Sequence, residues 1–128
     1  MAYVEHVNIT VADPQQTAQM LSDLFGWHVR WEGAAINGGY TVHVGTESSY
    51  IALYTGPGGA PHQKPADNSY LQRAGFNHVG VVVDDVDAME EKVKAKGLET
   101  HSHADYEPGK RFYFHDLDGV EYEVISYP

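Results

Sequence analysis

The stretch EHVNITVAD at residues 5–13 alternates apolar and polar side chains, which is typical of a strand with one buried face. A similar stretch, NHVGVVVDD, occupies residues 77–85. His78 in the second stretch lies 72 positions after His6 in the first, and alternation places each histidine on the face opposite the valines. A histidine that recurs at an equivalent position needs a different explanation from a single surface histidine.

The same order of elements follows each stretch. Asp13 is a good helix N-cap, and Gly26 is suited to end that helix. In the second half Asp84 or Asp85 takes the place of Asp13, and Gly97 takes that of Gly26. The first module is expected to contain a strand, a helix and three further strands, at residues 4–11, 14–25, 27–31, 40–44 and 50–54. The second module is expected to repeat this order, with strands at residues 76–83, 98–102, 111–115 and 120–126.

These patterns predict an α+β fold built from two tandem βαβββ modules. Module one covers residues 1–55 and module two residues 76–128, and a linker rich in glycine and proline joins them at residues 56–75. Neither module alone could bury both sides of its small sheet. We therefore expect a single domain over residues 1–128.

Composition limits the partners of the chain. There is no cysteine, so any metal must be bound by His, Asp, Glu or Tyr. A formal charge of −10 with only eight Lys and Arg residues argues against nucleic acid as a partner. No long apolar run and no secretion signal is visible, so we expect a cytoplasmic protein that does not contact a membrane.

The last strand supplies a third group of metal-binding type. There Tyr122 is expected to pack on a helix, which sends Glu121 and Glu123 to the opposite face. If the two sheets curve toward each other, His6, His78 and Glu123 can meet and serve as metal ligands. Two imidazoles and one carboxylate on one side of a cation leave positions open for water, substrate or dioxygen.

At this point the sequence resembles the vicinal oxygen chelate superfamily, which contains glyoxalases, bleomycin-resistance proteins and extradiol dioxygenases. The resemblance rests on EHVNITVAD, on FNHVGVVVDDVDAMEEKVKAKG at residues 76–97 and above all on FYFHDLDGVEYEVI at residues 112–125. It implies the fold of that superfamily, in which two βαβββ modules form a cupped mixed sheet around a metal or ligand cavity. It also implies one divalent metal ion such as Fe, Mn, Ni, Co or Zn, a small-molecule substrate bound through two adjacent oxygens, and a homodimer.

The metal positions of the superfamily fall on His6, Ala52, His78 and Glu123. Glyoxalase I enzymes usually have a carboxylate or amide at the position of Ala52, so the three remaining ligands are similar instead to those of extradiol dioxygenases and fosfomycin-resistance thiol transferases. Both groups tend to have a tyrosine ten positions before the glutamate, which is Tyr113 here. The resemblance implies that Tyr113 is an acid/base beside the metal and that Glu123 belongs to the catalytic set.

The reaction type stays open between oxidative ring cleavage and glyoxalase-like lyase or isomerase chemistry. An extradiol dioxygenase needs a further catalytic histidine, for which His62, His101 and His103 are candidates. His101 and His103 could also bind a metal together on one strand face, although solvated side chains are expected there. Glu121 is expected near the rim of the face that holds Glu123.

The alternative to an enzyme is a metal-free binding protein. Like the bleomycin-resistance proteins, it would sequester a cationic small molecule. The charge of −10, the aromatic residues Tyr50 and Tyr54, and the missing ligand at Ala52 favour it. The complete His-His-Glu set argues against it.

Overall fold

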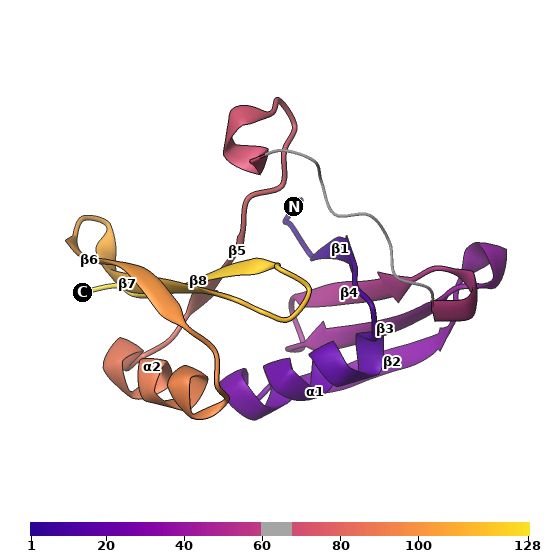
Figure 1. Cartoon of the computed structure of the whole chain (residues 1–128), viewed down its shortest axis with the longest axis horizontal. Coiled ribbons are helices and arrows are strands. Elements are labelled where there is room, and N and C mark those ends of the chain that lie inside the picture. The colour runs from indigo at the N-terminus through magenta and orange to yellow at the C-terminus, as the bar shows by residue number, and fades with distance from the viewer. Residues whose placement is uncertain (60–67) are drawn as a thin grey trace. The chain divides into compact units, whose positions relative to one another are not determined.

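The computed structural model describes residues 1–59 and 68–128. These fall into two compact units, one within Met1–Gln63 and the other within Lys64–Pro128. Each unit contains one βαβββ module, so the predicted pair of modules is confirmed. Figure 1 shows that each helix lies against the strands of its own module. The single-domain arrangement stays a prediction, and His62 lies outside the described residues.

The first module forms a four-stranded mixed sheet in the order β1-β4-β3-β2. Its elements are β1 (His6–Thr10), α1 (Pro14–Phe25), β2 (His28–Ala34), β3 (Tyr40–Gly45) and β4 (Tyr50–Thr55). β1 runs parallel to β4, and the other neighbours are antiparallel. Short 3₁₀ helices at Ile36–Gly38 and Pro57–Gly59 complete it.

The limits of α1 follow from its end residues. The Asp13 side chain accepts a hydrogen bond from the backbone N–H of Gln16 at 3.1 Å, which satisfies one of the unpaired donors of the first turn. Gly26 ends the helix in the left-handed region, with φ 72°. The helix buries Leu21 and Leu24 against the sheet, so the apolar side of the sheet is covered.

The second module has the equivalent sheet order β5-β8-β7-β6. Its elements are a 3₁₀ helix at Ser69–Leu71, β5 (Val79–Val82), α2 (Val86–Ala95), β6 (Thr100–Tyr106), β7 (Gly109–His115) and β8 (Glu121–Ser126). Asp85 caps α2 by accepting from the N–H of Ala88. Phe112, Phe114 and Tyr122 are at most 1% exposed and form the core beneath the helix.

Strand register supports the repeat. In the first module His6 pairs with Tyr50 across the parallel ladder. In the second module Val79 pairs with Tyr122, so the preceding residue, His78, is next to Glu121. The two histidines therefore occupy closely equivalent positions, since His6 is the first residue of β1 and His78 directly precedes β5.

The largest departure from the predicted elements is in β6, which was expected to end at Ser102 and runs to Tyr106. The register shifts between His101 and Ala104, and Ser102 has φ 56°. A bulge of this kind adds a residue on one strand and redirects the side chains around it. No alternation rule predicts it.

The β7–β8 turn is held by a buried carboxylate. Asp116, only 8% exposed, accepts the backbone N–H groups of Asp118 and Val120 at 2.9 and 3.0 Å and the hydroxyl of Tyr122 at 3.1 Å. These bonds fix the start of β8, where Glu121 lies. Among the described residues, no helix is long and apolar enough to span a membrane.

Candidate functional site

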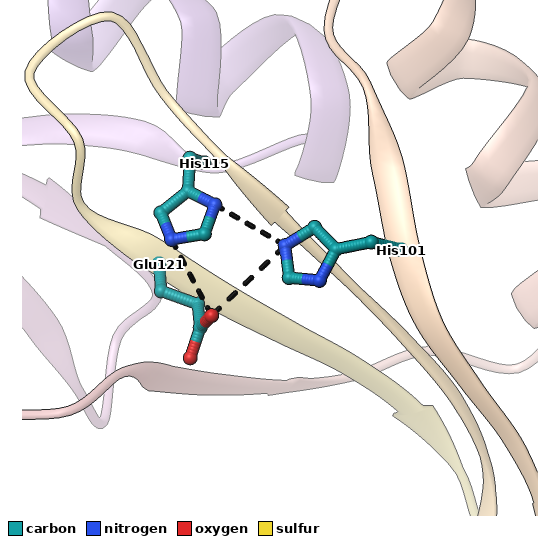
Figure 2. Close-up of side chains that lie close together, drawn as sticks. All are labelled: His101, His115 and Glu121. Carbon is teal, nitrogen blue, oxygen red and sulfur yellow. Dashed lines mark hydrogen bonds and ion pairs between the residues drawn. The ribbon is translucent and has the colours of Figure 1, made fainter. Parts of the chain in front are cut away.

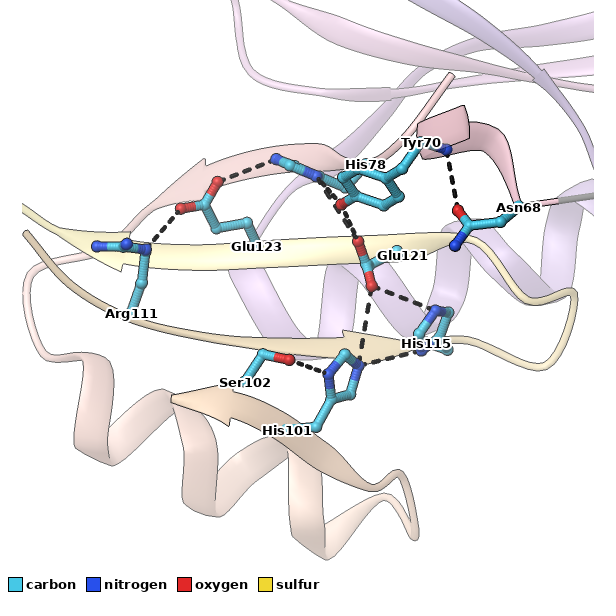
Figure 3. A network of polar contacts seen from close by, with 9 residues as sticks. All are labelled: Asn68, Tyr70, His78, His101, Ser102, Arg111, His115, Glu121 and Glu123. Atoms are coloured by element: carbon cyan, nitrogen blue, oxygen red, sulfur yellow. Dashed lines mark hydrogen bonds and ion pairs between the residues drawn. The ribbon is translucent and has the colours of Figure 1, made fainter. Parts of the chain in front are cut away.

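Side chains of metal-binding type gather on one face of the second sheet. Along β8, Tyr122 and Val124 are completely buried toward the helix, and Glu121 and Glu123 point to the other side, as alternation predicts. We call this side the network face. Figure 3 shows six of its members, His78, His101, Arg111, His115, Glu121 and Glu123. The seventh is Tyr113, whose ring contacts those of His78 and His101.

His78 and Glu123, two of the three predicted metal ligands, lie in contact. His78 Nε2 is 3.0 Å from Glu123 Oε1, and the side chains are 26% and 17% exposed. The other oxygen of Glu123, Oε2, lies 3.6 Å from Arg111 Nε. The arginine therefore holds one carboxylate oxygen and leaves the other directed at the imidazole.

Tyr70 determines which nitrogen of His78 carries a proton. Its hydroxyl donates to Glu121 Oε1 at 2.6 Å and lies 2.9 Å from His78 Nδ1. Since a phenol has a single proton, its oxygen must accept from His78, so Nδ1 is the protonated nitrogen. Burial and then the hydrogen bond to Glu121 raise the pKa of Tyr70 to about 12, which keeps the phenol neutral.

This tautomer makes the His78–Glu123 contact informative. In the neutral imidazole, Nε2 presents a lone pair to a carboxylate oxygen only 3.0 Å away. Two acceptors at this distance repel each other unless a proton or a cation lies between them. Imidazole nitrogen with carboxylate oxygen is a donor set that suits Fe, Mn, Ni, Co and Zn, so the pair fits the metal expected from the sequence.

Tyr113 lies beside this pair. It pairs with Glu123 across the β7–β8 ladder, and its ring meets that of His78 edge-on at 5.4 Å between centroids. Burial, followed by the charge of Glu123, raises the pKa of Tyr113 above its usual value. The hydroxyl is thus available as a proton donor at neutral pH, and its catalytic role stays a prediction.

A second cluster on the network face joins His101, His115 and Glu121 (Figure 2). Glu121 Oε2 lies 3.4 Å from His115 Nε2 and 3.9 Å from His101 Nε2. One ligand atom from each residue falls within 4.8 Å of the others. Glu121 was correctly placed on the same face as Glu123, but it is a central member of a cluster rather than a residue of the rim.

His115 was not singled out from the sequence. It stands two positions after Tyr113 on β7, so strand alternation could have placed it on the same face. His101 and His103 are both partly exposed, at 38% and 56%, and they do not share a strand face. His103 Nε2 contacts Glu90 of α2 at 2.6 Å, because the β6 bulge separates the two histidines.

His6 belongs to the first unit. Its Nδ1 lies 2.9 Å from Glu5 Oε1. Nε2 is therefore the ring nitrogen that could bind a metal, as in His78. The hydrogen bond with His6 lowers the pKa of Glu5. The His6 ring stacks on Tyr50 at 4.8 Å, and Tyr50 stacks on His43 at 4.6 Å. That His6 joins His78 and Glu123 on one ion stays a prediction.

Ala52 has no ligand atom and pairs with Asn8 and His43 in the sheet of the first unit. Burial, together with the charges of His6 and Arg30, lowers the pKa of His43. His43 is therefore neutral at pH 7, and its ring and that of Tyr50 place aromatic groups, rather than a carboxylate or amide, next to Ala52.

A cavity of about 270 Å³ lies between α2 and strands β6 and β7. Four of its ionisable groups are already paired, since Lys110 contacts Asp87 at 3.0 Å and His103 contacts Glu90. The metal-binding groups converge on the network face instead. We therefore place the candidate site there.

Comparisons with known proteins agree with this fold. Residues 3–124 match the model of the Glyoxalase/Bleomycin resistance protein/Dioxygenase superfamily. No curated protein has a sequence that matches the chain.

Three solved structures illustrate the similarity. A glyoxylase/bleomycin resistance protein/dioxygenase domain from Frankia sp. EAN1pec has a TM-score of 0.78 at 18% identity, with 100% of this chain and 99% of that one covered. The trypanothione-dependent glyoxalase I of Leishmania major has a TM-score of 0.78 at 15% identity, covering 98% and 87%. The fosfomycin resistance protein FosX of Listeria monocytogenes with Mn(II) and sulfate has a TM-score of 0.71 at 19% identity, covering 100% and 94%. The family match over nearly the whole sequence, together with the two βαβββ modules, establishes that the chain belongs to the Glyoxalase/Bleomycin resistance protein/Dioxygenase superfamily.

Proposed function

We propose that this chain is a metal-dependent enzyme that acts on a small substrate with two adjacent oxygens. Its divalent cation is bound by His78 and Glu123, with His6 as the third ligand, supplied by the same chain or by a second copy in a homodimer. The observation that best supports this proposal is the 3.0 Å distance between His78 Nε2 and Glu123 Oε1. In the neutral tautomer set by Tyr70, this Nε2 has no proton and can bind a cation. The Mn(II)-bound structure of FosX, a distant relative with the same fold, supports metal dependence.

Each surrounding residue has a distinct task in this proposal. Tyr70 holds the proton on His78 Nδ1 and so keeps Nε2 free to bind. Arg111 holds Glu123 Oε2 and orients the carboxylate. Tyr113 donates a proton to, or accepts one from, a substrate oxygen. The bound cation would supply Lewis-acid stabilisation of negative charge on the substrate oxygens.

An assay of reaction class tests the proposal. Chelator-treated, tag-free protein is loaded with Fe²⁺ without air and screened for oxygen uptake with catechols. In parallel, protein loaded with Ni²⁺, Mn²⁺ or Zn²⁺ is tested on hemithioacetals. We expect turnover in one of the two assays, with either catechols or hemithioacetals, and we expect His78→Ala to abolish that turnover. Turnover that persists in chelated His78→Ala would contradict metal dependence.

A metal-free binding protein remains the second candidate because of the aromatic groups of the first module. The guanidinium of Arg30 lies 4.4 Å from the centre of the Tyr50 ring, and that ring also stacks on His6 and His43. Trp31 is 51% exposed beside His43. Tight binding of a cationic aromatic compound to chelated protein, unchanged in His78→Ala, would favour this function.

A further inference from the structure

We propose that His101, His115 and Glu121 form a second divalent-cation site, distinct from the His78–Glu123 pair. The three side chains come from β6, β7 and β8 of one sheet and point toward one another (Figure 2). Glu121 Oε2 is the central atom, 3.4 Å from His115 Nε2 and 3.9 Å from His101 Nε2. Two ligands bound to one zinc-like ion at tetrahedral angles are separated by roughly 3.3–3.6 Å.

The outer atoms of two of these residues are already held by neighbours. His101 Nδ1 lies 2.9 Å from Ser102 Oγ, so Nε2 is the nitrogen directed into the cluster. Glu121 Oε1 accepts from Tyr70, so Oε2 is the oxygen directed into it. Partners that hold the outer atom of a histidine or carboxylate and orient the inner one are typical of metal sites.

Exposure shows where additional ligands would bind. The Glu121 side chain is only 14% exposed, and those of His101 and His115 are 38% and 49% exposed. The carboxylate is therefore anchored in the sheet, and the imidazoles border solvent. Water or an anionic ligand can complete the coordination. Two imidazoles with one carboxylate suit Zn²⁺, Co²⁺ or Ni²⁺ rather than Ca²⁺ or Mg²⁺.

Glu121 also couples this site to His78, and this part of the inference rests on the proposed function. A cation at Oε2 withdraws charge from the carboxylate and weakens the hydrogen bond that Tyr70 donates to Oε1. The phenol oxygen then becomes a weaker acceptor for His78 Nδ1, and the imidazole becomes a weaker ligand. We therefore expect each cation to lower the affinity for the other by several-fold, a reciprocal effect.

The same contacts could exist without a cation. His101 Nε2 lies 3.2 Å from His115 Nδ1, so the two rings could share a proton while His115 donates to Glu121. Such a chain satisfies the three side chains and binds no metal. Counting the sites separates the two possibilities.

Titration of tag-free, chelator-treated protein with Co²⁺, followed by visible absorption and calorimetry, counts the sites. We expect two sites in the wild-type protein and one each in His115→Ala and His78→Ala. The control His103→Ala, which loses a histidine of similar exposure paired with Glu90, retains both. His115→Gln repeats the test with a side chain of closer size, and circular dichroism of the metal-free variants confirms folding.

An equal number of sites in wild type, His115→Ala and His115→Gln would overturn the inference. If His115→Ala loses a site and His78→Ala does not, the second site stands and the proposed function fails. The coupling is supported if removal of His115 tightens the remaining site by several-fold.

Discussion

The hydroxyl of Tyr70 joins His78 Nδ1, at 2.9 Å, to Glu121 Oε1, at 2.6 Å. A residue of a short 3₁₀ helix thus sets the tautomer of a histidine on the sheet and links two groups of metal-binding side chains (Figure 3).

Tyr70→Phe should weaken cation binding by His78 and Glu123 about tenfold, because His78 loses the acceptor that keeps Nδ1 protonated. The measurement is a competition titration against a chelator in the His115→Ala background, which isolates this site. Tyr127→Phe, at a tyrosine that is 57% exposed, is the control. An unchanged dissociation constant in Tyr70→Phe would show that the hydroxyl does not orient the histidine.

Tyr113→Phe should retain the metal and lose most of its activity. General acid–base groups contribute about 10²–10⁴-fold to rate. Because burial and Glu123 raise the pKa of Tyr113, its proton is present throughout the neutral range, and the wild-type rate should fall only at strongly alkaline pH as that proton is lost. The kcat of metal-loaded protein on the substrate found in the screen, with metal content measured alongside, checks this. A kcat within twofold of wild type would exclude the role.

Glu90 should make the stability of the fold depend on pH. Its burial disfavours the charge, but hydrogen bonds from Thr100 and His103 outweigh this and hold its pKa below the usual value. Because the pKa of Glu90 is lower in the folded protein than in the unfolded one, its ionised carboxylate stabilises the fold at pH values above the unfolded pKa of about 4.5. This stabilisation is lost as the pH falls through the pKa of the folded protein.

Glu90→Gln should therefore reduce the free energy of unfolding in urea by about 1 kcal/mol at pH 7 and by much less at pH 3. Glu91→Gln, at an exposed neighbour, should have no such effect. A difference between Glu90→Gln and wild type that is the same at both pH values would contradict this account.

Asp116→Ala should destabilise the protein by about 2–3 kcal/mol, because it leaves buried donors in the β7–β8 turn without an acceptor. Asp116→Asn keeps one acceptor oxygen and should lose less. Urea unfolding measures both. Since the turn fixes the start of β8, the alanine variant should also lose metal held by Glu121. Equal stability of the two variants would show that the hydrogen bonds of this side chain do not hold the turn.

Much of the fold was predictable because local patterns specify it. The repeated histidine strand and the two aspartate caps gave the order of elements in both modules, and the structure agrees. The pairing of His78 with Glu123 followed from alternation within strands and from the repeat, since neighbouring strands of one sheet bring such residues together.

The remaining features of the site depend on non-local or irregular structure. Tyr70 contacts Glu121, 51 positions later, from a three-residue 3₁₀ helix that has no periodic pattern, so the sequence did not predict the contact. The separation of His101 from His103 depends on a bulge at which Ser102 adopts a positive φ. Serine is not a residue that signals this conformation, so alternation alone could not predict which faces the two histidines occupy.

We propose that His6, His78 and Glu123 together hold a divalent cation. The most direct measurement is the metal content of tag-free protein in the His115→Ala background after loading with Mn²⁺, Fe²⁺ or Zn²⁺ and removal of excess. We predict about one equivalent, lost on adding His78→Ala, Glu123→Ala or His6→Ala and retained on adding His28→Ala. Metal content that is near zero after loading, or unchanged by all three substitutions, would contradict the claim.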